Sequence, residues 1–325
     1  MVDRIPPGTR DVLPEEMREL RRIESSLLEV FAQRGYGEVR TPLIEYGNVL
    51  DKGAPSPGET IRFLDENGEL LALRNDMTIP IARLVATRLT EVPPPWRLCY
   101  SVNSLRPVAA KRGELREFGQ VGIELIGLDD GDPVAEVVTV LEAGLASLGL
   151  DRAVVGVGDS GLVTDLLTDY GVGAELVAEA AGLLAAGELV ELEKALVERA
   201  ELESGQVDSV MDVLRLRGTP EVLERAAQAA GPGLGRAIER LTETVRQVRA
   251  SGVGLEIVID LGLARDQTYY SGAILEVYEP SVGRTIGGGG RYDGLVQSFG
   301  LDETAAGITL YVERIHSAQL EEGLR

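Results

Sequence analysis

The sequence predicts an α+β fold in which an antiparallel sheet is flanked by helices and interrupted by a helical insertion. Two β-rich blocks, residues 1–159 and 251–325, lie on either side of residues 160–250. The middle block is rich in Ala, Leu and Glu and has helical periodicity. Because the strands gather in runs separated by one helical stretch, a single antiparallel domain with an insertion is favoured.

The first block contains one clear pair of long strands. Trp96–Val102 and Arg116–Ile126 are apolar, β-rich runs joined by a polar loop, which predicts an antiparallel pair. Residues 65–68, Asp-Glu-Asn-Gly, indicate a hairpin turn. Asp132 is the expected N-cap of a helix that begins at Pro133. The other expected elements are a helix over Met17–Arg34, a strand over Glu38–Pro42, hairpin strands over Ile61–Leu64 and Leu70–Leu73, helices over Thr78–Leu89 and Pro133–Leu148, and a strand over Ala153–Val157.

The second block resumes the β-rich pattern. Strands are expected over Leu255–Ile259 and Ala273–Tyr278. The four glycines Gly287–Gly290 predict a turn, and a final helix is expected from about Ala305.

Composition narrows the class of protein. The formal net charge is -21, and an acidic surface of this kind disfavours tRNA, whose binding depends on Lys and Arg neutralising phosphates. Cys99 is the only cysteine and is expected to be a buried free thiol, while His316, the only histidine, is expected to be structural or solvent-exposed. Neither a metal site nor a cofactor is predicted. With no apolar run of membrane-spanning length and no signal segment, a soluble cytoplasmic protein is expected.

Polar side chains on one face of the second long strand give the first indication of a binding site. Alternation places Phe118, Gln120, Gly122 and Glu124 on the same face. A buried carboxylate needs a partner, so this face suits an ammonium group together with an amide- or imidazole-like group. The alternative is a solvated sheet face.

Two further segments are unusual. Tyr269 and Tyr270 are adjacent in a chain with only 4% aromatic residues, and phenol rings can stack on a ligand and hydrogen-bond it. Gly287–Gly290, which precede Arg291-Tyr292-Asp293-Gly294, permit close backbone approach to a ligand but match neither phosphate-binding fingerprint. Ordinary packing and a flexible turn are the respective alternatives.

Taken together, these segments resemble the catalytic core of class II histidyl-tRNA synthetases over most of the chain outside residues 160–250. The matching segments, in family order, are Pro7-Gly8-Thr9-Arg10-Asp11, Leu73-Arg74-Asn75-Asp76-Met77-Thr78, the long strand pair, the Tyr-Tyr segment and the Gly-Gly-Arg-Tyr-Asp-Gly box. The resemblance implies a six-stranded antiparallel sheet flanked by helices, and a dimer.

The resemblance also implies a site for free histidine. The residues that match the histidine-binding positions of the family are Asp76, Gln120, Glu124, Tyr270 and Tyr292. Asp76 and Glu124 can pair with an α-ammonium through charge-assisted hydrogen bonds, and the two tyrosines can bracket an imidazole. Three arginines match the ATP- and phosphate-binding positions, as a vestigial site, namely Arg106, Arg265 and Arg314.

Three positions depart from the synthetase pattern. Val108 stands where the family has an acidic residue, and Tyr311 stands where it usually has a glycine, so its ring would fill adenine or ribose space. Asp266 replaces a glycine beside Arg265 and would partly neutralise a cation that the reaction needs. We therefore expect that adenylate formation is lost and that no residue is catalytic.

The chain is expected to have no anticodon-binding domain, since a synthetase continues beyond this point. The whole combination resembles the ATP phosphoribosyltransferase regulatory subunits. That resemblance implies a non-catalytic subunit required by the short-form catalytic subunit in the first step of histidine biosynthesis. It also implies a hetero-octamer that contains dimers of this chain and feedback inhibition by histidine.

Other interpretations stay open at this stage. A truncated or free-standing histidyl-tRNA synthetase paralogue would activate histidine with ATP, and the three matched arginines motivate it. A histidine-binding module with an unrelated partner is a third possibility. Histidine could also bind at a subunit boundary to which the pocket only contributes.

Overall fold

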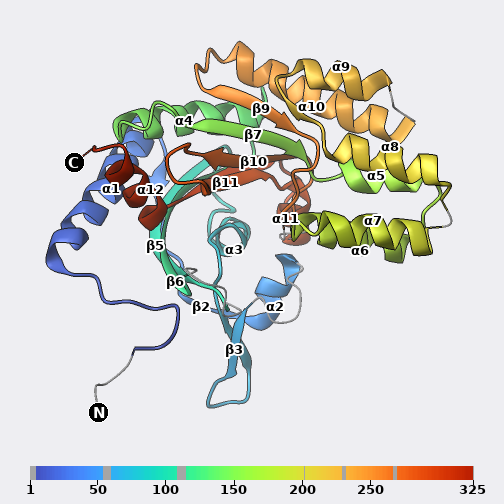
Figure 1. Ribbon diagram of the computed structural model, residues 1–325. Helices are drawn as coiled ribbons and strands as arrows, with labels where there is room; N and C mark the ends of the chain where they lie inside the picture. The colour runs from blue at the N-terminus through green and yellow to red at the C-terminus, as the bar shows by residue number, and fades with distance from the viewer. Residues whose placement is uncertain are drawn as a thin grey trace.

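A large curved sheet organises the molecule (Figure 1). The computed structural model describes residues 5–53, 60–107, 115–200, 202–228, 232–265 and 269–324. Within them the sheet has nine strands in the order β1-β5-β6-β12-β11-β10-β7-β9-β8. Their bounds are Gly37–Glu38, Trp96–Leu105, Glu117–Ile126, Ala305–Tyr311, Thr285–Arg291, Ala273–Tyr278, Val154–Asp159, Glu256–Asp260 and Arg217–Gly218.

The six strands from β5 to β7 are antiparallel throughout. They confirm the antiparallel core of the predicted α+β fold. The described sheet is larger than the six strands that the family resemblance implied, because β1 adds in parallel to β5 at one edge and β9 adds in parallel to β7 at the other. The predicted strand over Glu38–Pro42 is reduced to the two-residue β1.

Helices cover both faces of the sheet. On the outer face lie α1 (Pro14–Gln33), α4 (Pro133–Ser147) and α12 (Val312–Glu321), whose apolar sides pack with the sheet in one continuous core. On the inner, concave face lie α3 (Thr78–Arg88) and α11 (Asp293–Ser298), which share a second core. The Asp132 side chain accepts a hydrogen bond from the Val134 N–H at 2.7 Å, which confirms the predicted N-cap of α4.

Six of the described helices come from the middle of the chain and gather at the β7–β9 end of the sheet (Figure 1). In order they are α5 (Leu162–Asp169), α6 (Ala174–Ala185), α7 (Leu189–Arg199), α8 (Ser204–Leu214), α9 (Glu221–Gln228) and α10 (Pro232–Ala250). Their buried residues belong to the same hydrophobic core as the outer face of the sheet. Arg240 of α10 also pairs with Asp159 at the end of β7 at 2.6 Å. The helical segment is thus packed directly on the sheet.

A separate three-stranded sheet projects from the body. It has the order β2-β4-β3, with β2 at Ile44–Tyr46, β4 at Leu70–Leu73 and β3 at Ile61–Leu64. The predicted hairpin is confirmed, and its turn is closed by the Asp65 carboxylate, which accepts from the N–H groups of Asn67 and Glu69 at 2.8 Å. The short helix α2 (Gly47–Leu50) and the 3₁₀ turn η1 (Asp51–Gly53) follow β2.

Two predictions in the second block were wrong. The glycines Gly287–Gly290 do not form a turn but lie inside strand β11, where they let neighbouring groups approach closely. A Cβ on Gly289 would lie 2.0 Å from the Gly307 carbonyl oxygen, and one on Gly288 would lie 1.8 Å from Arg265 Nη1. Residues 305–311 are also not helical. They form the buried strand β12, and the last helix begins only at Val312.

Candidate functional site

A polar cavity lies between the inner face of the sheet and helix α3. The cavity has a volume of about 20 Å³, which leaves room for about one water molecule. It is lined by Asp76, Thr78, Arg106, Gln120, Glu124, Arg265, Tyr269, Tyr270, Gly288, Gly289, Tyr292, Gly307, Ile308, Thr309 and Tyr311. All five residues predicted to bind histidine, and two of the three predicted arginines, therefore line one cavity. This space is smaller than an amino acid, so lining side chains would have to move for such a ligand to enter.

Glu124 lies deepest in the cavity. Its side chain on β6 is 1% exposed, and its carboxylate accepts from Thr78 Oγ1 at 2.9 Å and from the Tyr292 hydroxyl at 2.5 Å. The Tyr100 hydroxyl contacts it at 3.5 Å. Burial raises the pKa of Glu124 to about 8, and the hydrogen bonds from Tyr292 and Thr78 oppose that shift. The predicted polar strand face is thus buried, and the solvated-face alternative was wrong.

Asp76 enters the cavity from the segment that leads into α3. Its side chain is 7% exposed, and Oδ1 accepts from the Ile79 N–H at 3.4 Å in the first turn of the helix. Burial raises the pKa of Asp76, and the backbone hydrogen bond acts against this shift. Two carboxyl groups that are both costly to ionise therefore face one small cavity, which favours a cation as the missing partner.

Gln120 and the tyrosines complete the inner wall. Gln120 is 2% exposed, and its Oε1 accepts from the Ser104 hydroxyl. The rings of Tyr269 and Tyr270 are tilted against each other with centroids 4.8 Å apart, and Tyr269 meets Tyr292 edge-on at 6.2 Å. The adjacent tyrosines thus form part of the cavity wall, together with the tyrosine that follows the glycine run.

The arginines gather around Tyr311 at the other end of the cavity. Arg106 Nη2 donates to the Tyr311 hydroxyl at 3.4 Å, and the Arg314 guanidinium lies 4.4 Å from the centre of the Tyr311 ring. Arg265 Nη1 donates to the Leu275 carbonyl at 3.3 Å, in the space left by Gly288. Burial alone would raise the pKa of Tyr311, but Arg106 and Arg265 outweigh it and lower that pKa to about 8. Tyr311 therefore fills the space between the cations.

Arg314 does not line the cavity. It lies on α12, where Nη1 donates to the Thr285 carbonyl at 2.8 Å, and its guanidinium lies over the Tyr311 ring, which does line the cavity. Val108 and Asp266, which were also predicted to mark the site, lie outside the described residues.

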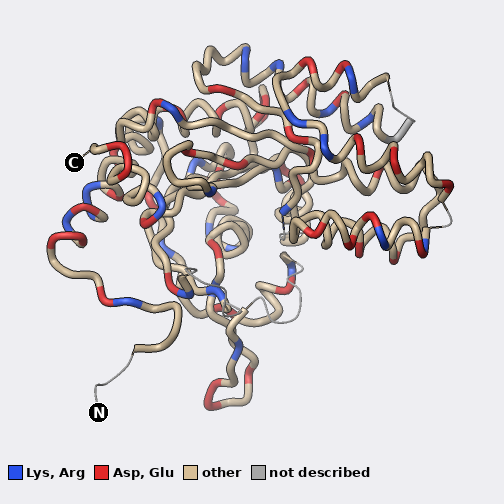
Figure 2. The backbone as a smooth tube through the Cα atoms, in the orientation of Figure 1, with Lys and Arg blue, Asp and Glu red and all other residues tan. Residues whose placement is uncertain are grey.

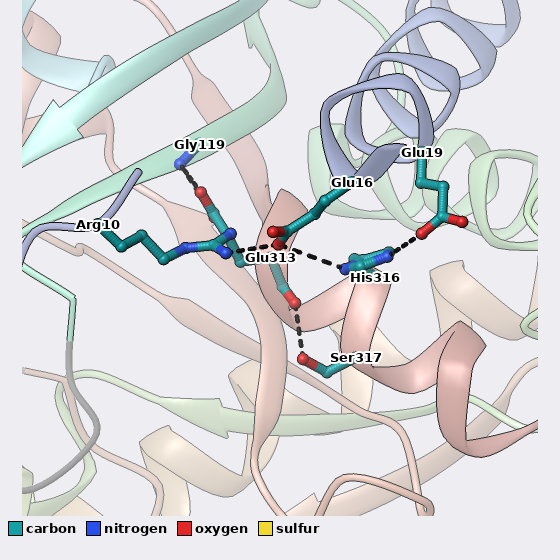
Figure 3. Close-up of polar contacts among 7 residues, drawn as sticks. All are labelled: Arg10, Glu16, Glu19, Gly119, Glu313, His316 and Ser317. Carbon is teal, nitrogen blue, oxygen red and sulfur yellow. Dashed lines mark hydrogen bonds and ion pairs between the residues drawn. The ribbon is translucent and has the colours of Figure 1, made fainter. Parts of the chain in front are cut away.

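The first turns of α12 are held against α1 and β6 by polar contacts (Figure 3). The Glu313 carboxylate accepts from the Gly119 N–H at 3.0 Å. His316 Nε2 hydrogen-bonds Glu19 of α1 at 2.6 Å, and Arg10 pairs with Glu16 at 2.5 Å. His316 is therefore a structural residue, which was the first of the two alternatives predicted for it. These contacts fix α12 directly beside Tyr311.

Several residues that line the cavity or contact Glu124 were missed by sequence reasoning. Thr78 and Tyr100 both contact Glu124, and Thr309 shares a hydrogen bond with the Tyr100 hydroxyl at 2.6 Å. Gly307 was missed as well, although a Cβ there would lie 1.8 Å from Glu124 Oε2. The strand pairing could have indicated Tyr100, which lies opposite Gly122 on the neighbouring strand.

Two other kinds of site, a reactive thiol and a metal centre, were sought among the described residues outside the cavity. Cys99 is a buried free thiol, as predicted, and burial raises its pKa to about 12, which makes it unreactive at neutral pH. Among the described residues no group of three or more His, Cys, Asp or Glu side chains could hold a metal ion. No helix in that part of the chain is long and apolar enough to span a membrane.

A curved antiparallel sheet with a carboxylate- and tyrosine-lined cavity on its concave face defines a class II, histidyl-tRNA-synthetase-like protein. A family model described as histidyl-tRNA synthetase matches residues 8–315. The ATP phosphoribosyltransferase regulatory subunit of Desulforamulus reducens is 36% identical over 313 residues, which make up 96% of this chain and 78% of that protein. The corresponding protein of Moorella thermoacetica is 36% identical over 320 residues, or 98% of this chain and 82% of that protein.

A solved structure agrees with these relatives. The protein from Bacillus halodurans C described as an ATP phosphoribosyltransferase regulatory subunit/histidyl-tRNA synthetase is 30% identical and superposes with a TM-score of 0.85, covering 98% of this chain and 83% of that one. The chain belongs to the ATP phosphoribosyltransferase regulatory subunit family within the histidyl-tRNA-synthetase-like proteins. The family predicted from sequence is confirmed, and the regulatory interpretation is favoured over the histidine-activating paralogue.

Proposed function

We propose that this chain senses histidine in the cavity beneath α3 and regulates a short-form ATP phosphoribosyltransferase catalytic subunit in the first step of histidine biosynthesis. The observation that carries the proposal is the burial of Glu124 and Asp76, two carboxyl groups with raised pKa values, in one cavity. We further propose that the chain dimerises, assembles with the catalytic subunit as a hetero-octamer in the cytoplasm and mediates feedback inhibition. Residues 1–159 and 251–325 would then form one core, with residues 160–250 as an insertion.

Each wall of the cavity has a role in this proposal. Glu124 and Asp76 bind the α-ammonium of histidine, because a cation removes the cost of burying two carboxylates. Gln120 supplies an amide that hydrogen-bonds the ligand, and Tyr270 and Tyr292 bracket the imidazole ring. The ligand carboxylate then lies toward the cationic end of the cavity, at Arg106 and Arg265, both of which line it.

We propose that the chain does not activate histidine and does not bind tRNA. Tyr311 supports the first point, because its ring is 7% exposed and fills the space between the arginines that ATP would need. The net charge of -21 supports the second, since tRNA binding depends on neutralising phosphates.

Reconstitution tests the regulatory role directly. Phosphoribosyl transfer by a short catalytic subunit would be measured with and without this chain while histidine is titrated. We expect stimulation by the chain and inhibition by histidine. The Glu124→Gln variant should still stimulate but should lose histidine inhibition, whereas Glu198→Gln, an exposed position on α7, should behave as wild type. If Glu124→Gln keeps full histidine sensitivity, the effector binds elsewhere, for example at a subunit boundary.

A histidine-activating enzyme is the second candidate function, and the presence of Arg106 and Arg265 in the cavity wall favours it. ATP–pyrophosphate exchange driven by histidine separates the two. We expect no exchange above background, and also no exchange in a Tyr311→Gly variant that reopens the space beside the arginines without restoring the other altered positions. Robust exchange by the wild-type chain would contradict the loss of adenylation.

A further inference from the structure

Strand β10 carries two polar side chains, Glu276 and Tyr278, on the concave face of the sheet, next to the cavity wall. Residues two apart along a strand share a face, and the Tyr278 hydroxyl donates to Glu276 Oε2 at 2.6 Å. The strand register places Glu276 between two glycines, Gly288 of β11 and Gly156 of β7. Neither Glu276 nor Tyr278 lines the cavity, so the proposed function gives them no role.

The two glycines make room for the side chains that contact Glu276. A Cβ on Gly288 would lie 1.8 Å from Arg265 Nη1, and a Cβ on Gly156 would lie 2.9 Å from the Tyr278 ring. Without these Cβ atoms, both larger side chains can lie close against the strands. Glu276 is thus flanked by a cation that lines the cavity and by a phenol that does not.

The Glu276 carboxylate is held away from this cation. Its Oε1 lies 3.7 Å from Arg265 Nη1, whereas Arg83 and Glu45 reach 2.6 Å in the same molecule. Charge-assisted hydrogen bonds between such groups normally measure about 2.7–2.9 Å. Burial and the hydrogen bond to Glu276 raise the pKa of Tyr278, so the phenol keeps its proton and remains a donor. Tyr278 therefore draws the carboxylate away from Arg265.

The charges at this end of the cavity make that distance important. Arg265 and Arg106 line the same small cavity, and each cation makes burial of the other more costly. The Glu276 carboxylate offsets part of this charge in the empty site. A bound ligand carboxylate would do the same, so Glu276 and the ligand compete for Arg265. The closer Glu276 lies to Arg265, the less a ligand gains from carrying a carboxylate.

We propose that Glu276 and Tyr278 are positioning residues that act through Arg265. Tyr278 holds Glu276 back, and the distance set in this way determines how strongly the cavity favours a ligand that carries a carboxylate. The inference rests on the proposed function, in which the histidine carboxylate lies toward Arg106 and Arg265, and it adds the residues that set this preference. An amino acid is then distinguished from a compound that has the same ring and ammonium group but no carboxylate.

The same contacts connect the cavity with the helical segment. Arg217 of β8, which lies between α8 and α9 in the chain, places its guanidinium 5.1 Å from the centre of the Tyr278 ring and pairs with Asp260 of β9 at 3.6 Å. A cation over an aromatic ring stabilises the position of that ring. The helices around β8 carry charged side chains of both signs (Figure 2). A shift of these helices would reach Arg265 through Tyr278 and Glu276.

Calorimetry with histidine and histidinol tests the proposal. In histidinol a primary alcohol replaces the carboxylate, so the ratio of the two affinities isolates the contribution of that group. We expect Glu276→Gln to raise the ratio about fivefold, because the competing charge is removed, and Tyr278→Phe to lower it about threefold, because the released carboxylate moves closer to Arg265. Arg217→Ala should lower the ratio by less. Glu276→Asp keeps the charge and should stay closer to wild type than Glu276→Gln. The matched control is Glu256→Gln, an exposed position on β9, which should leave both affinities unchanged.

The outcomes separate this inference from the proposed function. A wild-type chain that binds neither ligand overturns the proposed function. Wild-type binding with a ratio that Glu276→Gln and Tyr278→Phe leave unchanged, or move in the same direction, overturns only the positioning role. Equal losses for both ligands would indicate a purely structural role and also overturn it. Hydrogen exchange on the wild type needs no variant. Histidine should change the exchange of residues 273–278 more than histidinol does, and equal changes overturn the positioning role.

Discussion

Strand β6 has two buried faces with opposite chemistry. Val121, Ile123 and Leu125 pack against α1 and α4 in the outer core. Gln120 and Glu124 face α3 on the other side and are as deeply buried, at 2% and 1% exposure. The outer face is stabilised by packing alone. The inner face has to satisfy each polar group with hydroxyl donors from other parts of the fold, and it still leaves a cavity and a carboxyl group that resists ionisation.

Burial by itself therefore does not distinguish a hydrophobic core from a binding site. Both faces exclude water, but only the inner face carries buried carboxyl groups that a bound cation would stabilise in their ionised form. Substitutions that disturb both faces, or one face alone, would test this difference.

The largest effect is expected from Gly289→Ala in β11, on which both faces depend. A Cβ at this position would lie 2.0 Å from the Gly307 carbonyl oxygen of β12, a backbone atom that cannot move aside without breaking the sheet. We expect a loss of about 4 kcal/mol or more in the free energy of unfolding. Urea denaturation would measure it. Gly294→Ala in α11, where a Cβ would meet nothing within 4 Å, is the matched control and should not destabilise the chain.

Glu124→Ala should act on the inner face alone. Removing this carboxylate leaves the ligand ammonium with Asp76 as its only acidic partner in the proposed site, which we expect to weaken histidine binding by roughly 2–5 kcal/mol. Arg314→Ala should cost less, because Arg314 does not line the cavity. Isothermal calorimetry on both variants checks the order. Equal or reversed losses would mean that the cavity does not hold histidine in the proposed way.

Histidine binding should also depend on pH. The empty site holds Glu124 with a pKa of about 8, and an ammonium ligand favours the ionised form. Affinity should therefore rise about fivefold from pH 7 to pH 8, with release of close to one proton at pH 7. Calorimetry in two buffers of different ionisation enthalpy measures the release. Glu124→Gln should abolish it, and a wild-type protein that releases no proton would refute the assignment.

The raised pKa of Glu124 also makes the stability of the folded chain depend on pH. The folded pKa of Glu124 lies above its ordinary value of 4.5, so its favourable contribution is fully present below pH 4.5 and is lost as the pH rises through about 8. Unfolding of ligand-free wild type and Glu124→Gln across this window should show wild type losing stability relative to the variant. A difference that does not change with pH would contradict the raised pKa.

The smallest effect is expected on the outer face. Ile123→Val removes one methyl group from a fully buried side chain and should lower the free energy of unfolding by about 0.5–1.5 kcal/mol. Histidine affinity should not change, because Ile123 points away from the cavity. A clear loss of affinity would show that the two faces are mechanically coupled through β6.

Sequence reasoning succeeded where the signal is local. Alternation in β6, the turn at residues 65–68 and the cap at Asp132 are all encoded by neighbours in the chain, and each is confirmed. The glycine run was assigned wrongly because glycine has no side chain to reveal a strand period, and the groups that require it come from residues 265 and 307. The cavity residues required the family resemblance, since their convergence depends on strand order and not on spacing.

The small sheet β2-β4-β3 is connected to the cavity by a very short path. Leu73 is the last residue of β4, and the chain then passes Arg74, whose guanidinium donates to the Thr41 and Asn103 carbonyls, before it reaches Asp76. A displacement of the small sheet and a ligand bound at Asp76 would thus act on the same three-residue segment. Linkage requires that any effect of such a displacement on histidine affinity be matched by an equal effect of histidine on the position of the sheet. A molecule that contacts the small sheet would then tune the response to histidine without entering the cavity.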